Sequence, residues 1–190
     1  MVRTVLFAAA WLACVSTHLG AAMTCTNEDY KGRYSFFTTG SFLQLPPAAA
    51  ALAGPFSQAG TFTSDGRGNV AIQSTASYNG WIQPANVPAT YRVAADCTVS
   101  FSLTLPPPLG VAATFQGVLS SNNAQLSVMV TSPGGSTIVG SQIKQFIQGC
   151  RLSDLEGAYV IDLEGSAAGV KTAGGLTAKG PFRRIGRVIA

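Results

Sequence analysis

The sequence predicts an all-β fold, an eight-stranded antiparallel up-and-down barrel over residues 25–149. Short runs of alternating apolar and polar residues follow one another at even spacing, separated by clusters of Gly, Pro, Asn and Ser. Charged residues make up 11% of the chain, and Gly, Ser and Thr are frequent, as in extracellular all-β domains. No long stretch has the helical period. A two-sheet β-sandwich is the alternative architecture.

The clearest hairpin signal lies between Gly60 and Val70, where strand-like runs flank Asp65-Gly66 and Gly68-Asn69. These residues tolerate the positive φ that a tight connection between antiparallel strands requires. The same stretch matches a loose dinucleotide-binding fingerprint, and Asp65 with Asn69 suits part of a calcium loop. We set both aside, because strand-like residues follow where a helix is needed and the closing Glu of a calcium loop is missing.

The other elements can be placed in chain order. A polar lead-in from Cys25 precedes the first strand, and the alanine-rich stretch 45–54 predicts one or two helical turns after its prolines. Residues 81–88 contain two prolines and predict a loop. The predicted strands are residues 33–38, a strand leading into the hairpin turn, a strand from that turn to Tyr78, and residues 89–94, 98–105, 112–119, 125–131 and 136–146. Residues 98–105 alternate most regularly, which is typical of a half-buried strand.

Residues 1–22 predict a cleaved signal peptide. Arg3 supplies the positive start, residues 5–15 form the apolar run, and residues 20–22 are small, as a cleavage site requires. The apolar run is short for a membrane span, so we expect no stable span after cleavage; a retained anchor is the alternative. The protein is therefore expected to be secreted or periplasmic.

Signal cleavage would also remove His18, the one histidine of the sequence. A mature chain without imidazole has no Ser–His or Cys–His nucleophile and no histidine-ligated metal. We assign no catalytic residue, no metal ligand and no cofactor. The formal charge of +4 is diffuse, and its excess lies in the C-terminal tail. No basic stripe carries interleaved aromatic residues, so nucleic-acid binding is not predicted.

The pattern of the barrel begins again near residue 150. Cys25-x4-Tyr-x-Gly-x-Tyr34 returns as Cys150-x4-Leu-x-Gly-x-Tyr159, at an offset of 125 residues. Pro55-Phe56-x3-Gly60-x-Phe62 returns as Pro181-Phe182-x3-Gly186-x-Val188, at an offset of 126 residues. We interpret residues 150–190 as an incomplete second barrel repeat, truncated after its first two strands. The alternative is a hairpin that caps the first barrel.

The mature chain would contain three cysteines, an odd number for an oxidising compartment. If each repeat carries one internal bridge, Cys25 pairs with Cys97, and Cys150 is the counterpart of Cys25. A Cys97–Cys150 bridge is the alternative.

Three ordered elements of the barrel region are Cys25…Gly32-x-Tyr34, Pro55-Phe56…Gly60-Thr-Phe-x-x-Asp65-Gly-x-Gly-Asn69 and Thr90-Tyr-Arg-Val…Asp96-Cys-Thr98. Together they resemble a group of secreted bacterial proteins of uncharacterised function, over residues 25–146 and again from residue 150. The barrel outline is also similar to calycin and allene-oxide-cyclase-like barrels. This similarity is one of fold and implies no site.

Three functions fit such a barrel. The first is binding of a small apolar or amphipathic molecule, with an aromatic lining from Tyr34, Phe36, Phe62, Tyr91, Phe101 and Phe115. The second is a structural or surface-interaction role, with Trp81 as a contact residue. The third is a cyclase- or isomerase-type barrel enzyme, which would need an inward-facing charged residue; Arg33 and Arg92 are the candidates. Asp65 and Asp96 are interpreted as turn residues.

Overall fold

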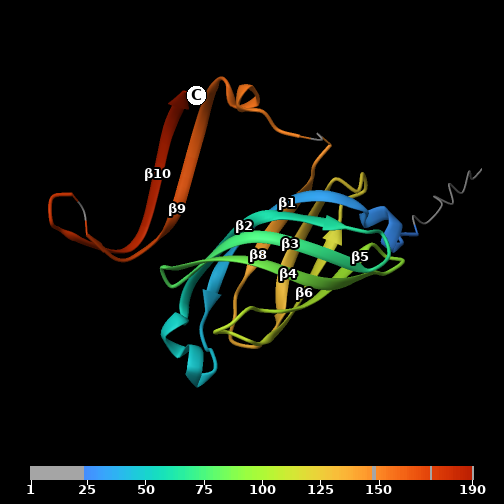
Figure 1. Ribbon diagram of the computed structural model, residues 1–190, viewed down its shortest axis with the longest axis horizontal. Coiled ribbons are helices and arrows are strands. Elements are labelled where there is room, and N and C mark those ends of the chain that lie inside the picture. The colour runs from blue at the N-terminus through green and yellow to red at the C-terminus, as the bar shows by residue number, and fades with distance from the viewer. Residues whose placement is uncertain (1–23, 147–148, 172, 190) are drawn as a thin grey trace, which may run out of the picture.

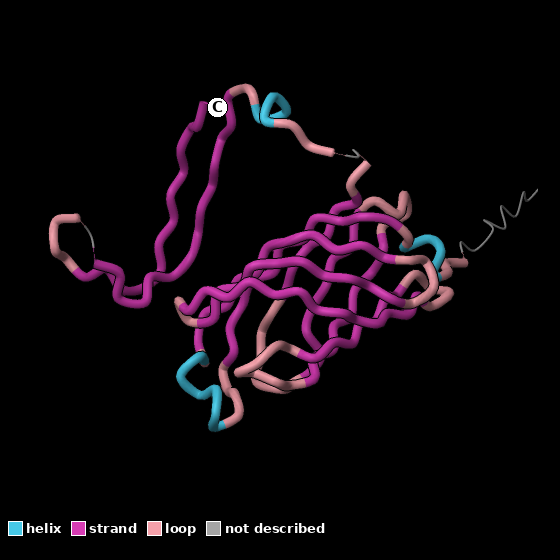
Figure 2. The backbone as a smooth tube through the Cα atoms, viewed as in Figure 1, coloured by secondary structure: helices cyan, strands magenta, loops and turns pink. Residues whose placement is uncertain are grey.

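The computed structural model describes residues 24–146, 149–171 and 173–189. The chain forms a closed eight-stranded antiparallel barrel and a separate two-stranded sheet (Figures 1 and 2). This confirms the predicted barrel and excludes the sandwich. The predicted signal peptide, residues 1–22, lies outside the described residues.

Each barrel strand pairs with the next along the chain, and the last pairs with the first. The strands are β1 (Gly32–Phe42), β2 (Gly54–Ser64), β3 (Asn69–Tyr78), β4 (Trp81–Val93), β5 (Thr98–Thr104), β6 (Ala112–Leu119), β7 (Gln125–Ser132) and β8 (Val139–Lys144). Short 3-10 helices lie at η1 (Asn27–Tyr30), η2 (Pro47–Leu52) and η3 (Leu152–Leu155). No helix in the described part of the chain has the length and hydropathy to cross a membrane.

The prediction of a loop at residues 81–88 is wrong, because β4 runs through them. β4 pairs with β3 from Trp81 to Thr90, but it pairs with β5 only from Ala89 to Val93. Pro84 and Pro88 therefore lie where β4 has a neighbour on one side only. A proline is tolerated there, since its missing N–H removes no ladder hydrogen bond on the free side.

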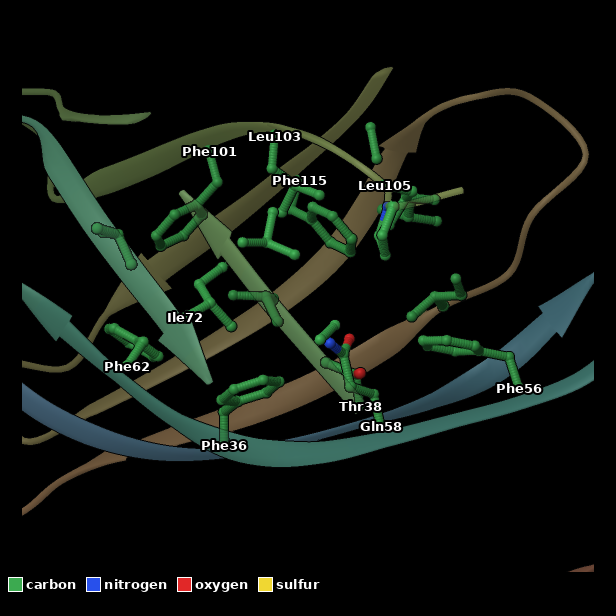
Figure 3. Close-up of a pocket in the computed structure, with 18 of the residues that line it drawn as sticks. Phe36, Thr38, Phe56, Gln58, Phe62, Ile72, Phe101, Leu103, Leu105 and Phe115 are labelled. Carbon is green, nitrogen blue, oxygen red and sulfur yellow. The ribbon is translucent and has the colours of Figure 1, made fainter. Parts of the chain in front are cut away.

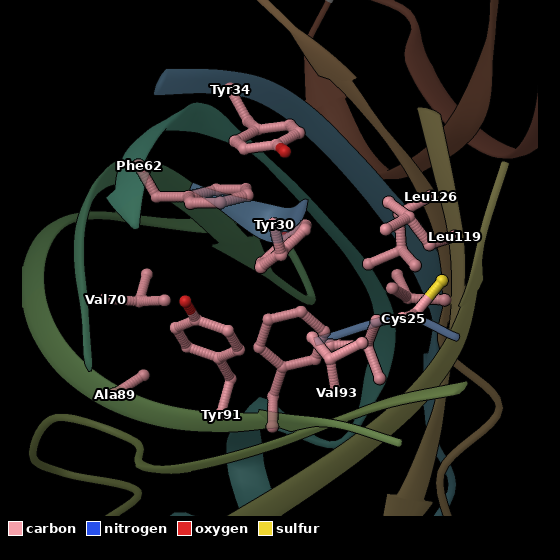
Figure 4. Packing of buried hydrophobic residues seen from close by; sticks show 13 residues of the cluster. Cys25, Tyr30, Tyr34, Phe62, Val70, Ala89, Tyr91, Val93, Leu119 and Leu126 are labelled. Carbon is pink, nitrogen blue, oxygen red and sulfur yellow. The ribbon is translucent and has the colours of Figure 1, made fainter. Parts of the chain in front are cut away.

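The side chains inside the barrel form two separate buried clusters, one at each end. The cluster at the η1 end contains Tyr30, Tyr34, Phe62, Tyr91 and Phe101 with nearby aliphatic residues (Figure 4). The cluster at the η2 end contains residues of β1, β2, β3, β6 and β7 together with residues of the covering loops. Helix η2 contributes Ala49 to it, the β5–β6 loop contributes Leu109 and the β7–β8 loop contributes Ile138, all three buried.

Helix η1 closes one end of the barrel as a plug. Its Tyr30 side chain is fully buried and donates a hydrogen bond to Oε1 of Gln142 on β8. Asn27 binds the opposite wall: its Oδ1 accepts from the Val93 N–H at 2.8 Å, and its carbonyl accepts from the Tyr91 hydroxyl at 3.1 Å. Burial raises the pKa of Tyr30, so this phenol stays protonated and remains a donor.

The Cys25–Cys97 disulfide fastens the residues before η1 to the β4–β5 turn, across a sequence separation of 72 residues. The pairing expected from the repeat is thus present, and the alternative bridge to Cys150 is excluded, because Cys150 is free and exposed. Next to Cys97, Asp96 organises the turn by accepting the Thr98 N–H at 3.0 Å, as expected from the sequence.

Asp65 organises the β2–β3 turn in the same way. Its carboxylate accepts the backbone N–H groups of Arg67 at 2.7 Å and Asn69 at 3.0 Å, and the Asn69 side-chain amide at 2.7 Å. These hydrogen bonds, with that of the Asn69 side chain the strongest, lower the pKa of Asp65 to about 2. The two residues considered as calcium ligands thus satisfy each other within a turn.

The second sheet consists of β9 (Ala158–Lys171) and β10 (Thr177–Ile189), which pair only with each other in the described structure. Its register matches that of β1 and β2 at the offsets found in the sequence. The corresponding Cα pairs are Tyr34–Phe62 and Tyr159–Val188, Phe36–Gly60 and Ile161–Gly186, Thr38–Gln58 and Leu163–Arg184, and Gly40–Phe56 and Gly165–Phe182.

The short helices ahead of the two hairpins match as well. Asp29 Oδ2 accepts the Thr26 N–H at 2.8 Å before η1, and Asp154 Oδ2 accepts the Arg151 N–H at 2.7 Å before η3. Helix η3 and the β9–β10 hairpin therefore have the local geometry of η1 and the β1–β2 hairpin, and in the part of the chain described β9 and β10 pair with no further strand.

Candidate ligand-binding cavity

A cavity of about 70 Å³ lies inside the barrel between the two buried clusters. Leu103 of β5 and Phe115 of β6 pack against both clusters and so mark the level of the cavity. The cluster around Tyr30 closes it towards η1. Towards η2 it is bounded by loop residues, among them Pro106 and Pro133.

Four apolar side chains that point into the barrel are only partly buried. They are Phe36, Ile72, Leu103 and Phe115, and all four line the cavity. In a barrel filled by side chains, inward-facing residues of this size are buried. Their remaining accessible surface therefore belongs to the internal space and indicates a lumen that is incompletely packed.

One wall of the cavity carries hydrogen-bonding groups. Thr38 of β1 lies opposite Gln58 of β2 in the sheet register (Figure 3). Gln142 lies on β8, the other neighbour of β1. The Gln58 Nε2 donates to Ser74 Oγ at 2.8 Å, and Gln142 Oε1 accepts from Tyr30. The Thr38 hydroxyl is buried and has no hydrogen-bond partner among the described residues.

The opposite wall is apolar. Strands β5 and β6 lie four strands away from β1 and β2 around the closed barrel, and they present Leu103 and Phe115 to the cavity. Within the described residues, Tyr78 is the one titratable side chain that lines the cavity, and burial raises its pKa to about 12. The lining is therefore uncharged at neutral pH and can accommodate a neutral molecule far better than an ion.

The structure divides the aromatic residues that were expected to line a binding site. Phe36, Phe62, Phe101 and Phe115 line the cavity. Tyr34 and Tyr91 instead pack against Tyr30, with ring centroids 4.7 Å and 5.2 Å from it. The two tyrosines thus belong to the plugged end of the barrel, because η1 inserts a residue that the alternation of the strands does not reveal.

The charged candidates for an enzyme site lie outside the barrel. Arg33 and Arg92 are exposed on the outer face, and the Asp65 and Asp96 carboxylates accept backbone N–H groups within turns. Trp81, considered as a surface contact residue, begins β4 with its ring 6.2 Å from that of Tyr78.

The polar wall was missed by the sequence analysis, although strand parity contains a signal for it. Thr38 lies two residues after the inward-facing Phe36, and Gln58 lies two residues after Phe56. A polar residue in phase with buried aromatics is the pattern to look for.

No protein-family model matches the sequence, and no curated protein is significantly similar to it. Among solved structures, the chain is similar to a redesigned β-barrel, mFAP1, in a structure with DFHBI bound. The identity is 15% and the TM-score is 0.43, and the match covers 62% of this chain and 97% of that chain.

Proposed function

We propose that the protein is a secreted barrel that binds a small, uncharged and largely apolar molecule in the cavity between its two buried clusters. The observation that carries the proposal is the set of inward-facing, partly buried side chains Phe36, Ile72, Leu103 and Phe115. An apolar ligand would remove this surface from contact with water, a gain of about 25 cal/mol per Å².

The size of the cavity restricts the ligand. At about 70 Å³ it is smaller than the roughly 150 Å³ apolar cavity that admits benzene. Binding therefore requires a slender molecule, or rotation of partly buried lining side chains such as Phe36 and Phe115. The loops with Pro106 and Pro133 favour entry from the η2 end, since η1 and the disulfide hold the other end closed.

Occupation of the cavity can be tested with the neutral fluorophore N-phenyl-1-naphthylamine, which is larger than the cavity of about 70 Å³ and therefore enters only when lining side chains such as Phe36 and Phe115 rotate. We expect the full chain, produced in an oxidising compartment, to bind it saturably with enhanced, blue-shifted emission. Ala85 of β4 lines the cavity, so Ala85→Phe should fill the space and lower the affinity at least tenfold. The matched control is Ala71→Phe, since Ala71 lies exposed on β3. Equal affinities for the two variants would place the fluorophore outside the barrel and refute the proposal.

Secretion is supported by the Cys25–Cys97 disulfide, which persists in oxidising compartments. A binding role is favoured over an enzymatic one because the cavity lining offers neither a carboxylate nor a cationic group for acid–base chemistry in the described structure.

We also propose that residues 150–190 are an incomplete second barrel repeat that acts as a contact segment. Two observations support the interpretation as a repeat: the two hairpins have matching registers, and the short helices before them have matching N-terminal hydrogen bonds. The β9–β10 hairpin exposes apolar residues such as Leu163, Phe182 and Val188 that correspond to inward positions of the first hairpin. Two strands do not bury such a face alone, so it favours contact with a partner.

Deletion of the β9–β10 hairpin distinguishes this proposal from the alternative that the hairpin caps the barrel. The barrel is closed by β1 and β8 without it, so residues 24–149 should unfold with the same free energy as the full chain, within about 0.5 kcal/mol. Urea unfolding followed by circular dichroism measures the difference. A loss of about 2 kcal/mol or more on deletion would show that residues 150–190 cap the barrel.

A further inference from the structure

The Thr38 hydroxyl is a polar group that the fold leaves unused. Thr38 is 5% exposed, it lines the cavity, and its Oγ1 has no hydrogen-bond partner in the described residues. A buried hydroxyl without a partner destabilises a protein by about 1–3 kcal/mol relative to a paired one. Packing does not require it, because Val has the same shape and avoids this cost.

The neighbours of Thr38 in the sheet do not satisfy it. On β2 its register partner is Gln58, whose Nε2 already donates to Ser74 Oγ at 2.8 Å. On β8 its register partner is Gly140, where any side chain would collide with the Thr38 methyl group. The glycine leaves the Thr38 side chain room at the wall but provides no group to bond with it.

Two further amide ends face the same region. With Nε2 bound to Ser74, Gln58 has its carbonyl oxygen left to accept a hydrogen bond, and with Oε1 bound to Tyr30, Gln142 has its NH₂ group left to donate. The wall therefore combines an acceptor, a donor and a hydroxyl that can act as either. Such a set matches a neutral hydroxyl or carbonyl group.

We infer that the ligand carries one uncharged hydrogen-bonding group, an alcohol or a carbonyl, which binds at Thr38 while the apolar remainder lies against β5 and β6. This inference rests on the proposed function. A carboxylate or ammonium group is disfavoured, because no opposite charge lines the cavity in the described structure and an unpaired buried ion is strongly destabilised.

Three small probes test the inference: hexan-1-ol, toluene and hexanoate at pH 7. Binding is measured on the full chain from saturable shifts of the methyl resonances of Val87, Leu103 and Val128, all of which line the cavity. We expect hexan-1-ol, a slender molecule, to bind, and toluene to bind with rotation of lining side chains such as Phe36 and Phe115. Hexanoate should bind at least tenfold more weakly than hexan-1-ol. Thr38→Val should lower the affinity for hexan-1-ol about threefold to tenfold and change the affinity for toluene by less than about twofold.

Thr63→Val is the matched control, because Thr63 lies exposed on the outer face of β2. It should change neither affinity. Without a ligand, Thr38→Val should melt at a temperature equal to or above that of the wild type, since it removes an unpaired buried hydroxyl. A lower melting temperature than that of Thr63→Val would reveal a structural role for the hydroxyl and overturn the inference.

The outcomes also separate the inference from the proposed function. If the wild type binds neither hexan-1-ol nor toluene, the cavity is not a binding site and both fail. The cavity binds ligands and only the assignment of Thr38 is wrong in two cases. In the first, toluene binds but Thr38→Val leaves the affinity for hexan-1-ol unchanged. In the second, hexanoate binds with the same affinity as hexan-1-ol.

Discussion

Loss of the Cys25–Cys97 disulfide is expected to lower the free energy of unfolding by about 4 kcal/mol. The bridge spans a sequence separation of 72 residues, and closing a loop of that length restricts the unfolded chain strongly. The bridge also tethers the residues before η1, so its loss lets the plug detach. The change to make is Cys97→Ser, and urea unfolding gives the free energy.

The design must deal with the free thiol of Cys150. Cys150 is exposed, so it can pair with the Cys25 that Cys97→Ser leaves behind. Cys97→Ser is therefore combined with Cys150→Ser. The protein with Cys150→Ser alone is the reference, and it should be as stable as the wild type. Reduction of the reference with dithiothreitol should reproduce the loss seen with Cys97→Ser. Equal stability of the reference and the Cys97→Ser protein would show that the bridge does not form.

Tyr30→Ala is expected to destabilise the barrel by about 3–5 kcal/mol. Tyr30 is fully buried, and its ring lies 4.7 Å from that of Tyr34, 5.2 Å from that of Tyr91 and 5.6 Å from that of Phe101. Truncation leaves a cavity at the centre of this cluster and an unpaired Gln142 amide. The loss is measured by urea unfolding followed by tyrosine fluorescence and circular dichroism.

Two variants identify the source of that loss. Tyr30→Phe keeps the ring and removes only the hydrogen bond to Gln142, so it should lose about 1 kcal/mol. Tyr159→Ala removes a tyrosine from the second hairpin and should leave barrel unfolding unchanged. A loss below about 1 kcal/mol for Tyr30→Ala would mean that η1 lies over the barrel end without plugging it.

The barrel was predictable because its strands obey a short period. Residues 98–105 alternate cleanly, and β5 and β6 begin and end within a residue of the expected bounds. The predicted strand at residues 89–94 is shorter than β4 because Pro84 and Pro88, considered locally, indicate a loop. Only the pairing of β4 with β3 and β5 shows that one side of β4 has no neighbour at these prolines.

The site was less predictable, for two physical reasons. Tyr30 lies in a single helical turn, which is too short to have a period, so nothing local indicates that it enters the lumen. Thr38 and Gln58 have the correct parity for the inner face, but polar residues in antiparallel strands usually face solvent. Whether such residues are buried depends on closure by β8, a pairing more than 100 residues away in sequence.

The uneven pairing of β4 has a kinetic consequence. Ten residues of β4 pair with β3. Only five pairs, from Ala89–Leu103 to Val93–Val99, join β4 to β5. These five pairs end at Ala89 and Leu103, on the side away from the disulfide, and Leu103 lines the cavity. Local opening there breaks few hydrogen bonds and leaves the rest of the wall intact. For a ligand bound as proposed, opening at this edge of β4 rather than global unfolding would set how long the ligand stays inside the barrel.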